Sequence, residues 1–236
     1  MDVERLRRAF PARHIDYYPA IDSTMRAAVG LEPGSVVIAG QQTGGQGRHG
    51  RRWHSEPSSG IYCSIALQPM PALTLALGLA TADAIARATG MVCDLRWPND
   101  VMLAEKKVAG ILVQVVDGHA IAGIGINVNH TSFPPELASE ATSLRLHTGA
   151  PVSSTGILLQ LLPAIDTFVD LDTETILRLF TRASSYAAGR RVTVEQSDGI
   201  IEGTTAGLDP AGFLIVHQDN GTDTLIVAGG VRAAGS

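Results

Sequence analysis

The sequence predicts an α+β fold, in which a mixed sheet with flanking helices is followed by a small β-barrel. Two observations support this fold class. Apolar, β-branched runs alternate with helix-forming segments over most of the 236 residues, and after Gly189 the pattern changes to short strands between tight turns. We therefore expect two domains, residues 1–187 and residues 188–236, because the short strands form a unit of their own.

Each helix of the first domain is predicted from its start and stop signals. The clearest is residues 73–89, which is rich in Ala and Leu and is followed by Gly90 in the usual stop position. Asp22 and the two residues after it start a shorter helix that ends at Gly30. The expected helices are residues 2–9, 22–29, 73–89, 153–169 and 173–182.

Strands are predicted where β-branched and apolar residues cluster. Asp117-Gly118 is a strong hairpin signal between the two longest runs, and Asp198-Gly199 is one of the turns expected in the second domain. The expected strands of the first domain are residues 14–18, 35–39, 61–67, 101–103, 108–116 and 119–129. Those of the second domain are residues 191–195, 200–205, 213–217 and 224–227.

The composition narrows the class of protein. Apolar residues make up 45% of the chain and charged residues 17%, which indicates a globular protein with a proper core. The net charge of -5 argues against general nucleic-acid binding, because that requires a net basic face. No uncharged apolar run reaches membrane-spanning length, the N-terminal residues carry no apolar signal core, and two cysteines make no disulfide framework. We expect a soluble cytoplasmic protein that binds neither DNA nor a membrane.

The stretch from Gly44 to Trp53, which we call the glycine loop, is the centre of the functional prediction. Its glycines disfavour a regular helix or strand and let backbone N–H groups approach a ligand closely. Arg48, Arg51 and Arg52 add forked donors that suit phosphate or carboxylate. We expect a loop that binds a small anionic ligand.

This stretch has three alternative interpretations. They are a dinucleotide-binding fingerprint, a P-loop and a plain basic loop. Gly45-x-Gly47-x-x-Gly50 matches the dinucleotide fingerprint, but no helix-forming sequence follows it. A P-loop is excluded because no Gly-Lys-Ser/Thr ends the motif. A solvated basic loop is the usual default, which the density of glycines disfavours here.

Polar residues near strand ends and glycines inside strands complete the candidate site. Gln42 follows a buried strand, and Asn99-Asp100 stands where another strand ends. The alternative interpretations are helix capping for Ser23 and Thr24, and a simple turn for Asn99-Asp100. Three glycines interrupt the two longest strands, which indicates a flat ligand lying against the sheet. These glycines are Gly110, Gly123 and Gly125.

A set of motifs follows in a fixed order along residues 20–130. They are Ser23-Thr24, Gln42, Gly45 to Trp53, Arg96 to Asp100, Lys107 to Leu112 and Gly123 to Asn127. Together they resemble the motifs of biotin–protein ligases of the monofunctional bacterial type, and the C-terminal strands fit that family's SH3-like domain. The resemblance implies a class II synthetase-like catalytic domain and a two-step reaction. Biotin and ATP give biotinyl-5′-AMP and pyrophosphate, and a lysine of a biotin carboxyl carrier protein then takes the biotinyl group and releases AMP.

The resemblance also implies roles for individual residues. Lys107, Arg48 and Asp100 are the expected catalytic residues, with Lys107 contacting both the biotin carboxylate and the phosphate. Mg²⁺ is expected with ATP, and Asp100 would hold it, orient the incoming lysine or help to remove its proton. The residues implied to bind biotin are Ser23, Thr24, Gln42, Gln46, Gly47, Arg48, Lys107, Gly110, Gly123 and Gly125. Those implied to bind the nucleotide are Arg48, Arg51, Trp53, Asn99, Lys107 and Asn127.

The sequence departs from the family pattern in two places. Gln46 stands where the family usually has Arg, and Met25 where it often has Asn. The alternative functions are a lipoate or octanoate ligase of related fold, a non-catalytic binding module, and a nucleic-acid regulator. The acidic balance and the lack of an N-terminal helix-turn-helix segment oppose the last of these. A homodimer formed through strand edges around residues 108–129 is a further expectation.

Overall fold

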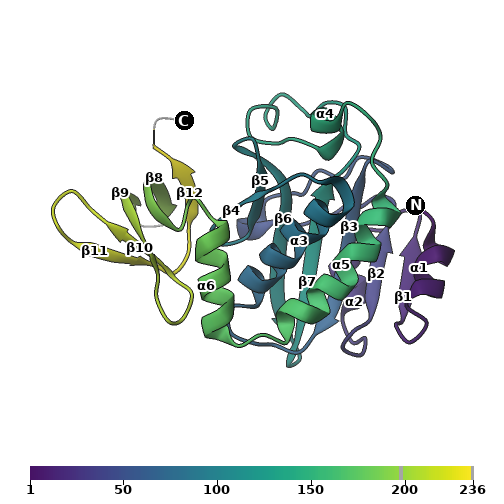
Figure 1. The fold of residues 1–236 in the computed structure, drawn as a ribbon. Coiled ribbons are helices and arrows are strands. Elements are labelled where there is room, and N and C mark those ends of the chain that lie inside the picture. The colour runs from purple at the N-terminus through teal and green to yellow at the C-terminus, as the bar shows by residue number, and fades with distance from the viewer. Residues whose placement is uncertain (197–198, 235–236) are drawn as a thin grey trace.

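The computed structural model describes residues 1–196 and 199–234, and its larger sheet contains the strands of the first domain (Figure 1). These strands are β1 (Ile15–Tyr18), β2 (Val36–Ala39), β3 (Gly60–Leu67), β4 (Asp94–Arg96), β5 (Asp100–Leu103), β6 (Lys106–Val116) and β7 (His119–Asn127). Their order is β1-β2-β3-β7-β6-β5-β4. β1 runs parallel to β2 and the other pairs are antiparallel, so the predicted mixed sheet is confirmed.

Helices cover both faces of this sheet. They are α1 (Val3–Ala9), α2 (Thr24–Ala28), α3 (Leu73–Thr89), α4 (Leu144–Thr148), α5 (Ser154–Val169) and α6 (Thr173–Ala183), with a 3₁₀ turn η1 (Arg48–Gly50). α3 and α5 lie side by side on one face, where they form the main core with strand residues such as Val36 and Ile38 (Figure 1). Val37 points to the other face, because side chains alternate along a strand, and packs there with Met25 and Ala28 of α2.

The C-terminal strands form a five-stranded antiparallel sheet in the order β11-β10-β9-β8-β12. They are β8 (Ala188–Gln196), β9 (Gly199–Leu208), β10 (Leu214–His217), β11 (Asp223–Ile226) and β12 (Gly230–Ala233). Trp97 connects the two parts of the chain, because its Nε1 donates to the Gly212 carbonyl oxygen at 2.9 Å. The division after residue 187 stays a prediction, and Asp198 of an expected turn lies outside the described residues.

Most elements begin and end close to their predicted bounds, and α4, β4 and β12 are the helix and strands that the sequence did not predict. All three are short, so none shows a clear apolar period. We expected exposed strand edges around residues 108–129, and this prediction is only partly correct. β7 lies inside the sheet, between β3 and β6. Within residues 108–129, the end of β6 beyond Ile111 is the part without a partner strand on one side, and Val115 there is 64% exposed. None of the described helices is long and apolar enough to cross a membrane.

Candidate active site

A cavity lies over β6 and β7, between α2 and the glycine loop. It contains about 460 Å³ of space between atoms, part of it open to solvent. Helix, loop and strand segments that are distant in sequence meet around it. The lining residues are Ser23, Thr24, Met25, Gln42, Gln46, Gly47, Arg48, Trp53, Cys63, Asn99, Lys107, Gly110, Ile111, Leu112, Gly123, Ile124 and Gly125.

Neutral polar side chains are held in place at the α2 end of the cavity. Gln42 Oε1 accepts hydrogen bonds from Thr24 N at 2.8 Å and from Thr24 Oγ1 at 3.0 Å. Thr24 Oγ1 also lies 2.8 Å from Ser64 Oγ. Ser23 precedes α2, but its side chain makes no helix-capping hydrogen bond with the described residues. Capping therefore does not account for Ser23, and this end presents a fixed set of donors and acceptors.

The glycines that interrupt β6 and β7 allow large side chains to lie close to the sheet. A Cβ atom on Gly125 would stand 2.6 Å from Trp53 Cζ2, and one on Gly110 would stand 2.9 Å from Trp53 Cζ3. A Cβ atom on Gly123 would stand 2.8 Å from Met25 Sδ. Only glycine fits these positions without moving Trp53 or Met25. The two side chains form apolar walls above the glycine floor.

The glycine loop folds back on itself. Gly47 N donates to the Arg51 carbonyl oxygen at 2.7 Å, and Gln46 and Arg52 form an antiparallel bridge. Between them the chain makes the turn η1, in which His49 has a φ of 57°. The loop therefore has a defined hairpin-like path that brings Gln46 and Gly47 to the cavity wall.

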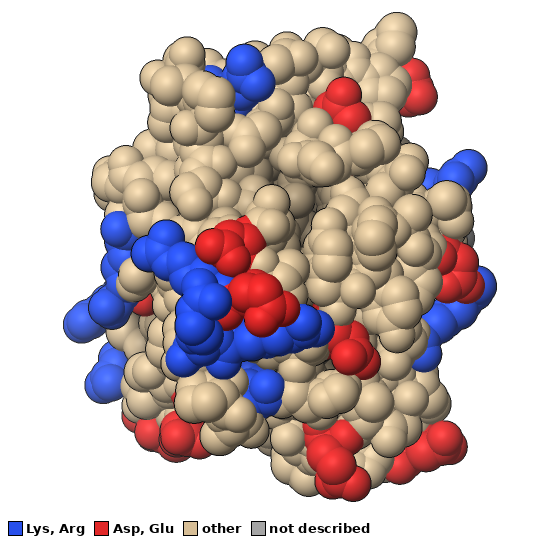
Figure 2. Space-filling model, turned by 90° about the vertical axis from the view of Figure 1, so that its right-hand side faces the viewer, with Lys and Arg blue, Asp and Glu red and all other residues tan. Residues whose placement is uncertain are grey.

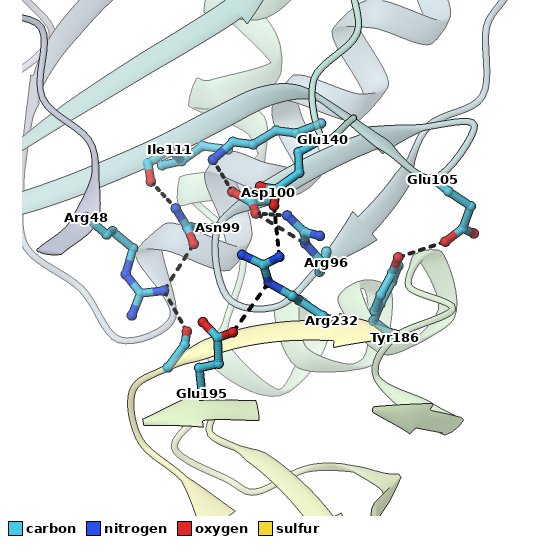
Figure 3. A network of polar contacts seen from close by, with 12 residues as sticks. Arg48, Arg96, Asn99, Asp100, Glu105, Ile111, Glu140, Tyr186, Glu195 and Arg232 are labelled. Carbon is cyan, nitrogen blue, oxygen red and sulfur yellow. Dashed lines mark hydrogen bonds and ion pairs between the residues drawn. The ribbon is translucent and has the colours of Figure 1, made fainter. Parts of the chain in front are cut away.

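Asp100 is a carboxylate buried between two cations. Arg96 Nη2 donates to one of its oxygens at 2.7 Å, and Lys107 Nζ forms an ion pair with the other (Figure 3). Burial would raise the pKa of the Asp100 carboxyl, but the charges of Lys107 and Arg96 outweigh it and hold that pKa below its usual value. Lys107 Nζ also lies 5.4 Å from the ring centre of Trp53. These contacts fix the lysine at the cavity wall.

Arg48 reaches the same region from the glycine loop. Its Nη1 donates to Asn99 Oδ1 at 3.1 Å and to the Gly229 carbonyl oxygen at 3.4 Å (Figure 3). Asn99 is itself held by Ile111, whose carbonyl oxygen accepts from Asn99 Nδ2 at 2.9 Å. Burial lowers the pKa of Arg48, and the charge of Asp100 opposes this shift. Two cations from different segments, Arg48 and Lys107, thus line one cavity.

The backbone of Lys107 is hydrogen-bonded to the segment of residues 140–142. Lys107 N donates to the Glu140 carbonyl oxygen at 2.8 Å, and Thr142 N donates to the Lys107 carbonyl oxygen at 3.0 Å. Asn127 Nδ2 lies 3.5 Å from the same Lys107 oxygen. The Glu140 side chain in turn forms an ion pair of 2.8 Å with Arg232 of β12 (Figure 3). The C-terminal sheet is thereby connected to the strand that carries Lys107.

The donor set around Asp100 does not fit a Mg²⁺ ion. Both oxygens of this carboxylate are already bound by cationic groups. Across residues 1–196 and 199–234, no group of three or more His, Cys, Asp or Glu side chains is placed to hold a metal ion. Mg²⁺ prefers several oxygen ligands in an octahedron, which this arrangement does not offer.

The structure brings together the residues that the sequence predicted to bind biotin, since every one of them lines the cavity. Trp53 and Asn99 of the nucleotide set line it as well, whereas Asp100, Arg51 and Asn127 are not among the described residues that do. Sequence reasoning did not assign the apolar strand residues of the lining to the site, because apolar side chains in strands look like ordinary core. These residues are Cys63, Ile111, Leu112 and Ile124. Met25 of α2, which the sequence marked only as a departure from the family pattern, lines the cavity as well.

Comparison with known proteins identifies the family. The Biotin/lipoate A/B protein ligase family matches residues 17–130, and the Biotin protein ligase C terminal domain matches residues 188–231. The biotin--[acetyl-CoA-carboxylase] ligase of Mycobacterium tuberculosis is 35% identical over 89% of this chain and 82% of its own length. This chain belongs to the biotin protein ligase family.

Other biotin protein ligases agree with this assignment. The bifunctional ligase/repressor BirA of Bacillus spizizenii is 32% identical over 92% of this chain and 73% of its own length. The biotin protein ligase of Aquifex aeolicus, solved in complex with biotin and ATP, is 29% identical, with a TM-score of 0.86 over 94% of this chain and 99% of that one. The resemblance inferred from the motifs is confirmed, and the α+β fold class with it.

Proposed function

We propose that the protein activates biotin with ATP to biotinyl-5′-AMP and transfers the biotinyl group to a lysine of a biotin carboxyl carrier protein. One observation carries this proposal: the cavity has fixed neutral polar groups at one end and also includes two cationic side chains. Biotin has a matching layout, with a neutral ureido ring at one end and a carboxylate at the other. Site, family and fold therefore point to the same substrate.

In the first step, an oxygen of the biotin carboxylate attacks the α-phosphorus of ATP, the bond to the bridging oxygen breaks, and pyrophosphate leaves. Two anions must meet, so cationic groups at the reacting centre lower the barrier. We assign this work to Arg48 and Lys107. Asp100 acts through Lys107 as a positioning residue, since its carboxylate fixes the ammonium. Mg²⁺ would enter as the counter-ion of the ATP phosphates.

In the second step, the amine of the carrier lysine attacks the carbonyl carbon of the mixed anhydride. A C–N bond forms, the C–O bond to the phosphate breaks, AMP leaves, and the amine loses a proton. Because the pKa of Asp100 lies below its usual value, its carboxylate is a weak base. We therefore assign Asp100 to orienting the groups around it and not to removing that proton.

The ring of biotin would bind where the polar side chains meet the glycines. Ser23, Thr24 and Gln42 would exchange hydrogen bonds with the ureido group, and Gln46 and Gly47 would close this end from the loop. Trp53 was expected on the nucleotide side, but its ring lies against the floor, so we place it beside the biotin ring. The floor residues are Gly110, Gly123 and Gly125.

The nucleotide would bind on the side of Lys107 that faces segment 140–142. Asn127 supplies a neutral amide there, Asn99 supplies a second one beside Arg48, and Arg51 supplies a further positive charge from the loop. Arg48 and Lys107 would contact the α-phosphate from both sides. The contacts of Asn99 with Arg48 and of Asn127 with Lys107 support this grouping.

The proposed function is tested by the exchange of labelled pyrophosphate into ATP in the presence of biotin, lipoate, octanoate or no acid. Exchange that depends on biotin is the expected result and establishes the adenylation step. Exchange with lipoate or octanoate alone would assign the protein to the lipoate or octanoate ligases of related fold. It would also contradict the proposed binding of the biotin ureido group by Gln42. Transfer is then measured as a mass increase on a purified carrier domain.

Three further expectations stay proposals. The two cysteines, Cys63 and Cys93, are free thiols, which suits a reducing compartment such as the cytoplasm. The edge of β6 around Val115 would carry a homodimer contact, which sedimentation would detect. The boundary of the catalytic biotin- and ATP-binding domain at residue 187, with the SH3-like domain from residue 188, would be tested by limited proteolysis.

A further inference from the structure

The turn between β5 and β6 connects the two strands that carry Asp100 and Lys107. The pairing of these strands leaves a loop of only two residues, Ala104 and Glu105. The register also shifts within β5, so the ladder is locally irregular close to Lys107. Because the register of a hairpin is fixed by its turn, the conformation of this loop decides how Asp100 faces Lys107.

Both residues of this turn have a backbone conformation that their side chains disfavour. The φ angle is 48° at Ala104 and 63° at Glu105, as a type I′ hairpin turn requires. The turn between β6 and β7 also has positive φ at both positions, but it uses Asp117-Gly118, which adopts this conformation readily. Ala and Glu have a Cβ atom and no short polar side chain, so the β5–β6 turn needs support from surrounding contacts.

The Glu105 carboxylate supplies this support through Tyr186 and Arg190, and we call these three residues the turn clamp. The Tyr186 hydroxyl donates to Glu105 Oε2 at 2.9 Å (Figure 3). Arg190 Nη2 donates to the same oxygen at 2.6 Å, and Arg190 Nη1 donates to Oε1 at 3.3 Å. The hydrogen bonds from Arg190 and Tyr186 hold the pKa of the Glu105 carboxyl below its usual value, so the clamp is charged at neutral pH.

The turn clamp differs from the ordinary ion pairs of the surface. Figure 2 shows acidic and basic side chains mixed on one face of the molecule, and isolated exposed pairs contribute little to stability. The clamp is bidentate, and the Arg190 guanidinium lies 3.9 Å from the ring centre of Tyr186, which is buried. It also joins the turn to residues 81 and 85 positions further along the chain. A network of this kind can select one turn conformation.

We propose that Glu105 is a positioning residue for the adenylation step, because the turn clamp keeps the turn left-handed and thereby keeps Lys107 paired with Asp100. This inference rests on the proposed function, which assigns Lys107 to the reacting centre. Glu105 is not among the described residues that line the cavity, so it acts through Lys107. Without the clamp, the turn relaxes toward conformations that its residues favour, and the Lys107 ammonium leaves the cavity wall in part of the molecules.

The experiment compares four full-length proteins: wild type, Glu105→Gln, Ala104→Asn/Glu105→Gly and Asp166→Asn. Glu105→Gln removes the charge of the clamp and keeps the size of the side chain. Ala104→Asn/Glu105→Gly also lacks the carboxylate, but Asn-Gly adopts a type I′ turn without help. Asp166→Asn is the matched control, because Asp166 accepts from Arg13 with both oxygens at 2.7 and 2.6 Å and is 55% exposed, against 62% for Glu105. It lies on α5, which packs on the face of the sheet away from α2 and the cavity.

The first measurement is biotin-dependent pyrophosphate exchange. We expect kcat of Glu105→Gln to fall about fivefold, the size of effect that the loss of one exposed ion pair can have on a conformation. KM for biotin should change less than about twofold, since the groups that bind the ureido end are untouched. Ala104→Asn/Glu105→Gly and Asp166→Asn should both stay within about twofold of the wild-type rate, because the turn of the first is self-supporting and the second leaves the clamp intact.

The second measurement is a spectroscopic one that needs no turnover. The chain has only two lysines, so NMR of protein labelled with ¹³C-lysine gives two Cε signals, which Lys106→Arg assigns. Lys107 Nζ lies 5.4 Å from the ring centre of Trp53, so the ring current of the indole makes the Lys107 signal sensitive to position. In Glu105→Gln this signal should move and the Lys106 signal should stay, whereas a loss of stability alone moves neither signal of the folded protein.

Equal kcat in Glu105→Gln and Asp166→Asn, or an unmoved Lys107 signal, would overturn the inference and leave the proposed function intact. The inference would also be overturned if Ala104→Asn/Glu105→Gly were as slow as Glu105→Gln, because the turn conformation would then not be the link to Lys107. Absence of biotin-dependent exchange in the wild type would overturn the proposed function. The NMR comparison would still decide whether Glu105 holds Lys107 in place.

Discussion

The carboxylate of Asp100 holds the ammonium of Lys107 in an ion pair at the cavity, with only 14% of the Asp100 side chain exposed. Removing one partner of a buried pair leaves the other charge uncompensated and free to move. We expect Asp100→Asn to lower kcat of biotin-dependent exchange about 10²-fold, because Lys107 loses its fixed position. Asp94→Asn is the matched control, since Asp94 lies in the neighbouring strand and bonds Ser185. An unchanged kcat in Asp100→Asn would remove Asp100 from the mechanism.

Arg48 joins the glycine loop to Asn99 and to the backbone at Gly229. Without its guanidinium, the loop loses both contacts, and the mixed anhydride loses a counter-charge. We expect Arg48→Gly to release biotinyl-5′-AMP and to label lysines of a bystander protein about tenfold faster than wild type, because the site no longer retains the intermediate.

The control for this prediction is Arg52→Gly in the same loop, where the lost contact is a hydrogen bond to the Thr43 carbonyl oxygen. Labelling of serum albumin, followed by streptavidin blot, measures the leak. If Arg48→Gly labels albumin no faster than Arg52→Gly does, then retention of the intermediate does not depend on Arg48.

Gly125 leaves no room for a methyl group beneath Trp53. An alanine there would place its Cβ atom 2.6 Å from Trp53 Cζ2, so the indole ring must move. We expect Gly125→Ala to weaken biotin binding at least about tenfold, or ~1.4 kcal/mol, as measured by calorimetry. Gly230→Ala is the control, because no described atom lies within 4 Å of a Cβ atom at that position. Equal affinities in the two variants would show that Trp53 does not border the biotin ring.

His130 makes the stability of the fold depend on pH. It is fully buried, stacks on Phe133 with ring centres 5.1 Å apart, and lies 3.3 Å from the Tyr62 hydroxyl. Burial lowers the pKa of His130 from 6.5 to about 4; His54 adds to this shift and Glu56 opposes it. The folded state thus favours the neutral ring. Its contribution to stability is complete above pH 6.5 and is lost as the pH falls toward 4.

Urea unfolding of wild type and His130→Gln tests this dependence. Between about pH 7.5 and pH 5, wild type should lose roughly 2 kcal/mol more unfolding free energy than the variant, because only the wild-type unfolded state binds the extra proton. Other titrating groups are common to both proteins and cancel in the comparison. A variant that loses as much stability as wild type would show that His130 titrates normally.

The sequence predicts much of the fold and the cavity for identifiable reasons. Strands such as β2 and β3 are continuous apolar runs, and α3 has both a helical composition and a glycine stop. The cavity is predictable because its polar and glycine residues lie in ordered motifs. The position of Trp53 is not, since a tryptophan after a basic loop carries no local sign of which ligand it faces.

Contacts between distant segments are the part that sequence reasoning did not predict. The ion pair of Glu140 with Arg232 joins residues that are 92 positions apart, and each residue alone looks like an ordinary surface charge. The same applies to Arg48 and Gly229, which are 181 positions apart. Such contacts depend on how the two sheets pack, which no local pattern in the chain specifies.

The Glu140–Arg232 pair leads to the final prediction, because Glu140 also binds the backbone of Lys107. We expect Arg232→Glu to slow biotin-dependent exchange about threefold to fivefold, since exposed ion pairs contribute up to about 1 kcal/mol. The double variant Arg232→Glu/Glu140→Arg restores the opposite charges and should recover most of the rate. Arg191→Glu breaks a second ion pair of the C-terminal sheet, with Asp219, and serves as the control. If the double variant stays as slow as Arg232→Glu, the ion pair does not position segment 140–142. The C-terminal sheet then affects the site through another contact, and the hydrogen bond from Arg48 to the Gly229 carbonyl oxygen is the nearest candidate.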